Sequence, residues 1–149
     1  MIKIVNLKNM RRLAKDENNT CIAIVRSMKN PVAGVTQLDV LSPSRQLFYW
    51  YLDQSRAGCW NRDAFENGYL PRFLKEIRTN PAAGRALKSI WSRSRAGENI
   101  ALGCFCADET TCHRSIIAGL LSGSGADVRT ETGRDYSEYW KIYQAIPRA

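Results

Sequence analysis

The chain has 149 residues, of which 44% are hydrophobic and 24% are charged. This length suits a single domain over residues 1–149, and the composition excludes disordered, collagen-like and coiled-coil proteins. No apolar run approaches the roughly 20 residues that a helix needs to cross a bilayer, and the charged N-terminal segment does not resemble a secretory signal. We therefore expect a cytoplasmic protein that contacts no membrane.

The formal net charge is +8 at pH 7, which favours phosphate-rich partners such as nucleotides or nucleic acids. The basic residues are spread along the chain, and no helix-turn-helix, RNA-recognition or zinc-finger pattern is visible. Charge therefore leaves a non-enzymatic protein associated with nucleic acid as an alternative to a small-molecule binder. It does not indicate an oligomeric state.

The first half of the chain predicts a strand followed by helices. Residues 20–26, Thr-Cys-Ile-Ala-Ile-Val-Arg, form a short β-branched run typical of a buried strand, with Arg26 at its carboxyl end. Ser42 and Pro43 indicate an N-cap followed by proline in the first helical turn. Residues 63–69 predict another helical segment.

The second half of the chain alternates strands and helices. The predicted elements are a helix starting at Asn80-Pro81, a strand over residues 99–105, a helix over residues 112–121 capped by Thr111, a strand over residues 127–131, and a last helix beginning at Asp135. Strands separated by helices pair in parallel, with helices on both faces. We expect an α/β fold with a small, mostly parallel sheet flanked by helices in three Rossmann-like layers.

The most informative segment runs from Ile100 to Arg114 and holds three of the five cysteines and the only histidine. It leads from the predicted strand into the predicted helix, where open α/β folds place their ligand sites. Cys104 and Cys106 point to the same side if the strand extends that far. The odd number of cysteines and a reducing compartment disfavour disulfides, which leaves packing groups, metal ligands or reactive thiols.

Cys112, His113 and Arg114 occupy the first turn of the predicted helix. The free N–H groups and the dipole of a helix N-terminus bind anions and lower the pKa of a nearby thiol. We therefore expect Cys112 to be a nucleophile or thiolate contact, and His113 to carry a proton or orient a ligand. The expected ligand-binding residues are Arg26, Cys104, Cys106, Thr111 and Arg114, the two arginines facing one crevice as a clamp for phosphate.

Two other interpretations of this segment stay open. Cys104, Cys106, Cys112 and His113 are the residue types of a zinc site, which would make the protein a zinc-stabilised interaction module. The Cys-x-Cys spacing is unusual for zinc, however, and neighbouring side chains diverge by about 100° on a helix. Alternatively the cysteines are packing groups, and His113 and Arg114 hold the loop. No cofactor other than zinc is indicated.

With these residues in view, the chain resembles the domain of unknown function 488 (DUF488) family. Members carry a strand ending in cysteine, a short acidic loop and Cys-His-Arg opening a helix, as in residues 101–106 and 112–115. The further matches are Arg26, Leu41 to Ser44, Trp60, Phe65, Tyr69 and the segment 73–77, so that the resemblance covers residues 20–129. The chain departs from the family pattern at residues 29–31, where Pro-Arg-Gly is frequent, and at Cys106, where an acidic residue is common.

The resemblance implies an α/β fold with a pocket between the end of the first strand and the Cys-His-Arg loop, and it implies no established reaction. Taken with the residues, it predicts binding of a nucleotide-like or other phosphorylated or anionic small molecule. Whether the bound molecule is also transformed, and which molecule it is, stays open at this point.

Overall fold

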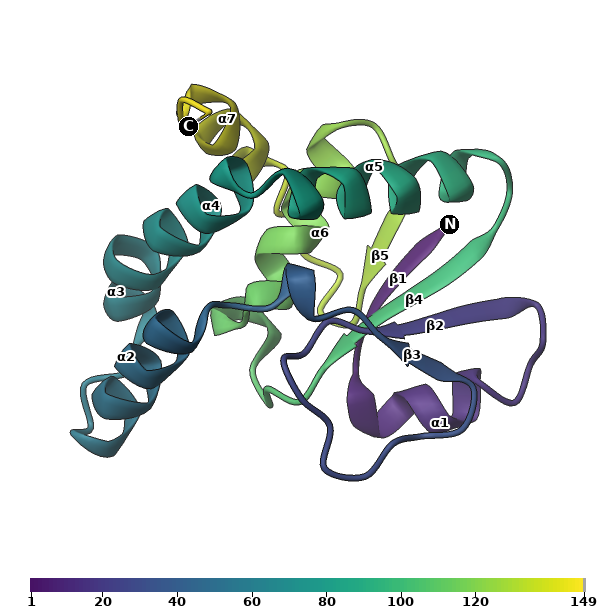
Figure 1. The fold of residues 1–149 in the computed structure, drawn as a ribbon, viewed down its shortest axis with the longest axis horizontal. Helices are drawn as coiled ribbons and strands as arrows, with labels where there is room; N and C mark the ends of the chain where they lie inside the picture. Colours follow the sequence, from purple (N-terminus) through teal and green to yellow (C-terminus); the bar gives the residue numbers. More distant parts are fainter. Residues whose placement is uncertain (149) are drawn as a thin grey trace.

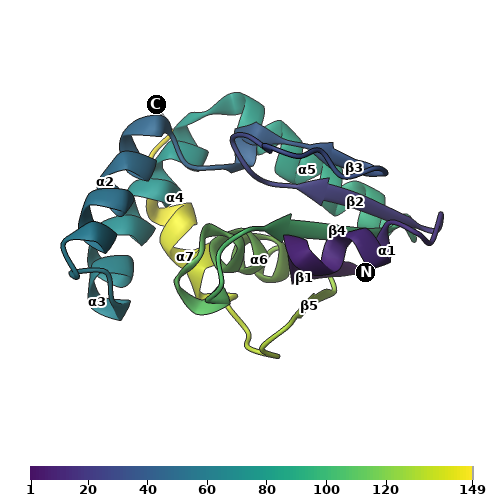
Figure 2. The ribbon, with the colours of Figure 1, turned by 90° about the horizontal axis from the view of Figure 1, so that it is seen from below.

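The computed structural model describes residues 1–148, which form a five-stranded sheet between helices (Figures 1 and 2). The strands are β1 (Ile2–Asn6), β2 (Asn19–Ala23), β3 (Val35–Gln37), β4 (Asn99–Cys104) and β5 (Val128–Thr130). They pair in the order β3-β2-β4-β1-β5, and every pair is parallel. The predicted α/β fold is therefore confirmed.

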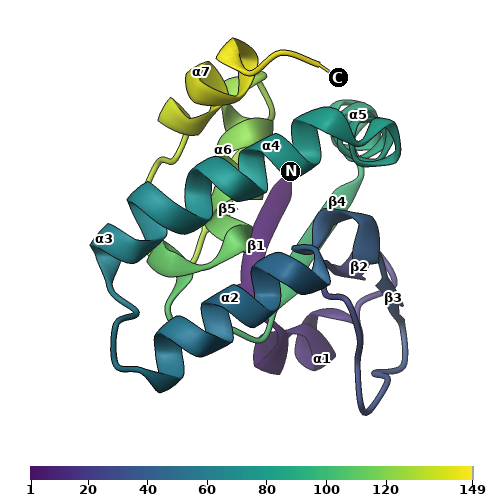
Figure 3. The ribbon, with the colours of Figure 1, turned by 60° about the vertical axis from the view of Figure 1, so that its left-hand side comes forward.

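The helices are α1 (Met10–Leu13), α2 (Arg45–Arg56), α3 (Arg62–Ala64), α4 (Leu70–Thr79), α5 (Pro81–Arg95), α6 (His113–Gly123) and α7 (Glu138–Ala145). Short 3-10 segments occur at η1 (Leu7–Asn9), η2 (Asp39–Leu41) and η4 (Glu109–Thr111), and a π-helical turn, η3 (Phe65–Tyr69), joins α3 to α4. Figure 3 shows α3 and α4 as one continuous rod, with α2 alongside it. Within residues 1–148, no helix combines the length and apolar character that a bilayer crossing requires.

Side-chain alternation along the central strands builds a separate core on each face of the sheet. Ile100 and Leu102 of β4 point into the larger core, which α4, α5 and α6 cover. Ala101 between them points into the smaller core, where it packs with Met10 of α1. Period-two alternation in buried parallel strands thus produces the three layers.

The sequence pattern does not predict β1 or β3. β1 lies at the centre of the sheet between β4 and β5, and Ile2 and Ile4 are fully buried there. Its pattern is obscured by Lys3 and Asn6, which are only half-buried. β3 has three residues at the sheet edge, too few to form a recognisable pattern.

Three helices begin at other residues than the sequence predicts. Ser44, not Ser42, caps α2: its hydroxyl accepts the Leu47 N–H at 3.1 Å and is held by the Glu76 carboxylate of α4. Cys112, not Thr111, is the N-cap of α6, because Thr111 is the last residue of η4. α7 begins after Ser137 rather than Asp135, whose carboxylate accepts the Ser137 N–H at 2.8 Å.

Close contact between α6 and the segment leading into α7 depends on glycine. A Cβ atom at Gly119 would lie 2.2 Å from the backbone oxygen of Tyr136, and one at Gly123 would lie 2.2 Å from the Cβ of Trp140. Real side chains do not approach this closely, so the backbone of the α7 segment must move away if either glycine gains a methyl group.

We expect Gly119→Ala to lower the free energy of unfolding by about 2 kcal/mol, because a backbone carbonyl must shift to admit the methyl group. Gly84→Ala in α5 is the matched control, since nothing lies within 4 Å of a Cβ there. It should instead raise stability by about 0.5–1 kcal/mol through helix propensity. Urea unfolding followed by circular dichroism measures both changes, and equal effects would show that the contact with Tyr136 is unimportant.

Candidate functional site

The carboxyl ends of β2 and β4 lie side by side at a topological switch point. After β2 the chain runs to β3 at one edge of the sheet, whereas after β4 it passes β1 to reach β5 at the other edge. The segments leaving two adjacent strands in opposite directions open a crevice between them, and open α/β folds bind their ligands in such crevices.

A cavity of about 270 Å³ occupies this crevice. Residues from several segments line it: Val25, Arg26, Ser27, Ser42, Pro43, Phe48, Tyr51, Tyr69, Cys104, Phe105, Cys106, Thr111, Cys112 and His113. Aromatic rings from α2 and η3 form its wall, and Arg26 and Ser27 are exposed at its rim. Its size and largely apolar lining, with a few polar groups, are those of a small-molecule site.

Four side chains converge at the floor of the cavity. The Sγ of Cys104 lies 3.7 Å from the Sγ of Cys106 and 3.8 Å from the Nδ1 of His113. The same Nδ1 lies 3.8 Å from the Sγ of Cys112. All four donor atoms lie within 4.8 Å of one another, so the end of β4 and the start of α6 bring together the thiols and the imidazole singled out from the sequence. We call these four residues the thiol cluster.

One hydrogen bond orients the imidazole of His113. Its Nε2 lies 2.7 Å from the backbone oxygen of Ile24, in the segment that follows β2. A carbonyl oxygen can only accept, so Nε2 carries the proton and donates it. Phe73 packs edge-on against the ring, with the centroids 5.6 Å apart. The ring therefore presents Nδ1 to the sulfur atoms and is held there from two sides.

The thiols of the cluster differ in their pKa values. Hydrogen bonds from Cys106 and Cys112 lower the pKa of Cys104, and the neighbouring imidazole adds to this. The hydrogen bond to Cys104 raises the pKa of Cys106 to about 12. Burial lowers the pKa of His113, but the negative charge of Cys104 and the hydrogen bonds to Cys104 and to the Ile24 carbonyl together outweigh it, so that the net pKa is raised.

Burial raises the pKa of Cys112, and its hydrogen bonds to the other two thiols raise it further. The expectation that the helix N-terminus lowers this pKa is therefore wrong. Cys112 is only 1% exposed, and the loss of hydration exceeds what the helix dipole contributes. Cys104 is the thiol that these contacts favour as the anion.

The structure separates the two arginines that the sequence placed in one crevice. Arg26 borders the cavity, where its Nε and Nη2 donate to the Pro43 oxygen at 3.1 and 2.8 Å. Arg114 lies beneath the loop instead, and among the described residues it is not part of the cavity lining. Its Nη1 donates to the backbone oxygens of Cys106 at 2.7 Å and Cys104 at 3.4 Å. Arg114 thus holds the loop, as the packing interpretation expects, rather than a ligand in the cavity.

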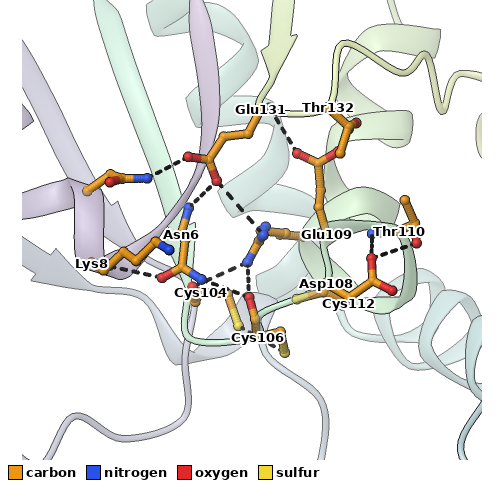
Figure 4. A network of polar contacts seen from close by, with 12 residues as sticks. Asn6, Lys8, Cys104, Cys106, Asp108, Glu109, Thr110, Cys112, Glu131 and Thr132 are labelled. Carbon is orange, nitrogen blue, oxygen red and sulfur yellow. Dashed lines mark hydrogen bonds and ion pairs between the residues drawn. The ribbon is translucent and has the colours of Figure 1, made fainter.

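The acidic loop contains a buried carboxylate that sequence reasoning missed. Glu109 is 3% exposed and accepts hydrogen bonds from the Glu131 N–H at 2.9 Å and the Tyr136 hydroxyl at 2.7 Å. The Thr132 hydroxyl donates to the same carboxylate (Figure 4). This contact joins η4 to the segment after β5 and fixes the loop that carries the thiol cluster. No local sequence signal distinguishes Glu109 from its exposed neighbour Asp108.

Sequence reasoning also missed most of the cavity wall. Phe48 and Tyr51 are three residues apart on α2, so both lie on one face of that helix. Helical spacing could have paired them, but only the tertiary structure brings that face over the end of β4. Thr111, expected to contact a ligand, does border the cavity.

Residues 2–125 match the family model described as the active DUF488-N3 subclade. The matched region extends from β1 to the end of α6 and includes the thiol cluster, Arg26 and Arg114. No curated protein and no solved structure matches the chain.

Proposed function

The chain belongs to the DUF488 family, and from the geometry of its site we propose that it binds a small anionic molecule, such as a nucleotide or another phosphorylated compound. One observation carries the proposal: a cavity of about 270 Å³ lies at the switch point of the sheet, with a guanidinium at its rim and the thiol cluster at its floor. These are the features of a ligand site in an open α/β fold.

Arg26 is the group that would attract the anion. It is exposed at the rim, and its guanidinium carries five N–H groups, more than the Pro43 carbonyl takes up. The hydroxyl groups of Ser27 and Thr111 can add hydrogen bonds to a phosphate or carboxylate. The rings of Phe48 and Tyr51 form an apolar wall suited to a base or another flat group.

The sulfur atoms at the floor would meet the other end of the ligand. Cys104 and Cys112 are both almost completely buried, so in this proposal they line the floor of the cavity rather than act as exposed nucleophiles. His113 keeps a positioning role, since its Nε2 is committed to the Ile24 carbonyl.

A second hollow, beside the carboxyl end of α6, is a candidate surface for the alternative function, binding of nucleic acid. It has a volume of about 670 Å³ between α4, α5 and α7 and includes Arg78, Arg85, Lys88 and Arg148. Arg78 donates from its Nε to the Ile146 oxygen at 2.9 Å and covers the Tyr143 ring, and among the described residues this hollow has no thiol or imidazole in its lining. We therefore favour the small-molecule site, where reactive groups and a cation meet.

Isothermal titration calorimetry with adenosine 5′-monophosphate and with inorganic phosphate tests the proposal. We expect Arg26→Gln to weaken binding of both probes by roughly 10-fold or more, because a charge-assisted hydrogen bond is lost. Arg56→Gln is the matched control: this exposed arginine at the end of α2 does not line the cavity, so affinity should stay within about 2-fold. The proposal would be refuted if the unmodified chain bound neither anion. It would also be refuted if the Arg26 variant bound both anions as tightly as the unmodified chain does.

A further inference from the structure

We infer that the thiol cluster is a metal centre, in which Cys104, Cys106, Cys112 and His113 coordinate one Zn²⁺ ion. The inference goes beyond the anion site described above and does not require a ligand in the cavity. It rests on the spacing of the four donor atoms, on the contacts behind them and on their chemistry.

The spacing of the donors is that of a tetrahedral zinc site. Zn–S bonds of about 2.3 Å and Zn–N bonds of about 2.0 Å place neighbouring ligand atoms roughly 3.5–3.8 Å apart. Three pairs in the cluster are separated by 3.7, 3.8 and 3.8 Å, and no pair exceeds 4.8 Å. Closing the wider pairs by up to about 1 Å would complete the tetrahedron.

The backbone removes the objection that adjacent residues diverge on a helix. Cys112 is the N-cap of α6, with φ −115° and ψ 148°, and is therefore extended rather than helical. His113 is the first helical residue. Because the chain changes conformation between them, the two neighbouring side chains turn toward the same point, where the end of β4 supplies the other two ligands.

The contacts behind the cluster are those that metal ligands need. The Nε2–H of His113 donates to the Ile24 oxygen at 2.7 Å, which leaves the lone pair of Nδ1 facing the sulfurs. Such a bond from the second ring nitrogen to a carbonyl typically accompanies metal-binding histidines. Three thiolates and Zn²⁺ carry a net charge of −1, and the buried guanidinium of Arg114, bonded to the Cys104 and Cys106 carbonyls, offsets it.

The donor set selects the class of metal. Three soft sulfur donors and one imidazole favour Zn²⁺ over Mg²⁺ or Ca²⁺, which take oxygen ligands. Four protein ligands close the coordination sphere, as in structural zinc sites, so the ion would fasten β4 to α6. Cys106 is the most exposed of the four and borders the cavity, which provides the entry path for the ion.

Metal analysis of the full chain, purified under reducing conditions without chelators, tests the inference. We expect about one zinc per chain by mass spectrometry of the intact protein and by elemental analysis. Cys104→Ser and Cys112→Ser should each reduce zinc content at least ~5-fold, whereas Cys59→Ser should leave it unchanged, because Cys59 is exposed and outside the cluster.

Since unfolding of a cysteine variant would also empty the site, a second measurement uses the unmodified chain. After removal of its metal, addition of Co²⁺ should produce the visible bands of a tetrahedral ion and sulfur-to-cobalt charge transfer, and Zn²⁺ should abolish both. The inference would be overturned if the purified chain held less than roughly 0.2 metal ions and cobalt gave no such bands. The assignment of the cation would be overturned if the chain held iron in place of zinc. Arg26→Gln should retain its zinc even if it loses anion binding, so the two proposals fail separately.

Discussion

Replacing Arg114 by alanine is expected to lower the free energy of unfolding by about 3 kcal/mol, because the change removes a buried charge that holds three parts of the chain together. Arg114 is 2% exposed. It donates to the Cys106 oxygen at 2.7 Å, and its Nη2 lies 3.9 Å from the Glu131 carboxylate. Its loss leaves a space beneath the loop and Glu131 without its cation.

Lysine at this position should recover only a small part of the loss. A single ammonium group cannot reach the loop carbonyls and the Glu131 carboxylate at once, as the planar guanidinium does. Arg129→Ala is the control: its ion pair with Asp127 is largely exposed, so the change should stay within about 0.5 kcal/mol. Urea unfolding followed by tryptophan fluorescence measures all three variants. A loss below about 1 kcal/mol for Arg114→Ala would contradict its role in holding the loop.

Replacing Glu109 by alanine is expected to cost about 3 kcal/mol as well, because the change removes the acceptor for three hydrogen bonds at once. The largest share of the lost stability is expected at the Tyr136 hydroxyl. Tyr136 is 1% exposed, and its hydroxyl donates to Glu109 at 2.7 Å. A buried hydroxyl without its acceptor has given up its hydrogen bonds to water and lacks a strong hydrogen bond within the protein to replace them. The Glu131 N–H, 2.9 Å from the carboxylate, loses its partner in the same step.

Glutamine at position 109 should give an intermediate loss, because the amide keeps one acceptor oxygen but turns an NH₂ group toward a donor. Glu17→Ala is the control, an exposed carboxylate whose removal should change stability by less than about 0.5 kcal/mol. Thermal unfolding followed by circular dichroism compares the variants. If Glu109→Ala matched Glu17→Ala, the buried network of Figure 4 would contribute nothing to stability.

Both residues act through Glu131, which connects the two networks. Its N–H donates to Glu109, while its carboxylate accepts from the Asn6 N–H at 2.7 Å and from Asn9 at 2.6 Å. Figure 4 shows the Glu131 side chain beside Asn6, at the end of β1. Arg114→Ala and Glu109→Ala are therefore neighbours, and their effects on stability should not add.

The sequence alone determined the fold class and the position of the site along the chain. Asn80 is one example. Its side chain accepts a hydrogen bond from the Ala82 N–H and caps α5, as predicted. This start is predictable because an N-cap and the proline after it act over only a few residues. The apolar run that forms β4 and the Cys-His-Arg start of α6 are local signals of the same kind. Such signals do not depend on the rest of the chain.

Only the tertiary structure decided which of the predicted residues meet. Arg26 and Arg114 look alike in the sequence, yet one borders the cavity and the other is buried beneath the loop. Glu109 is buried because the segment after β5 brings a threonine, a tyrosine and a backbone N–H to it from more than 20 residues away. Burial and long-range contacts raise the pKa of Cys112 and orient His113, and these depend on packing between strands and helices that no local pattern encodes.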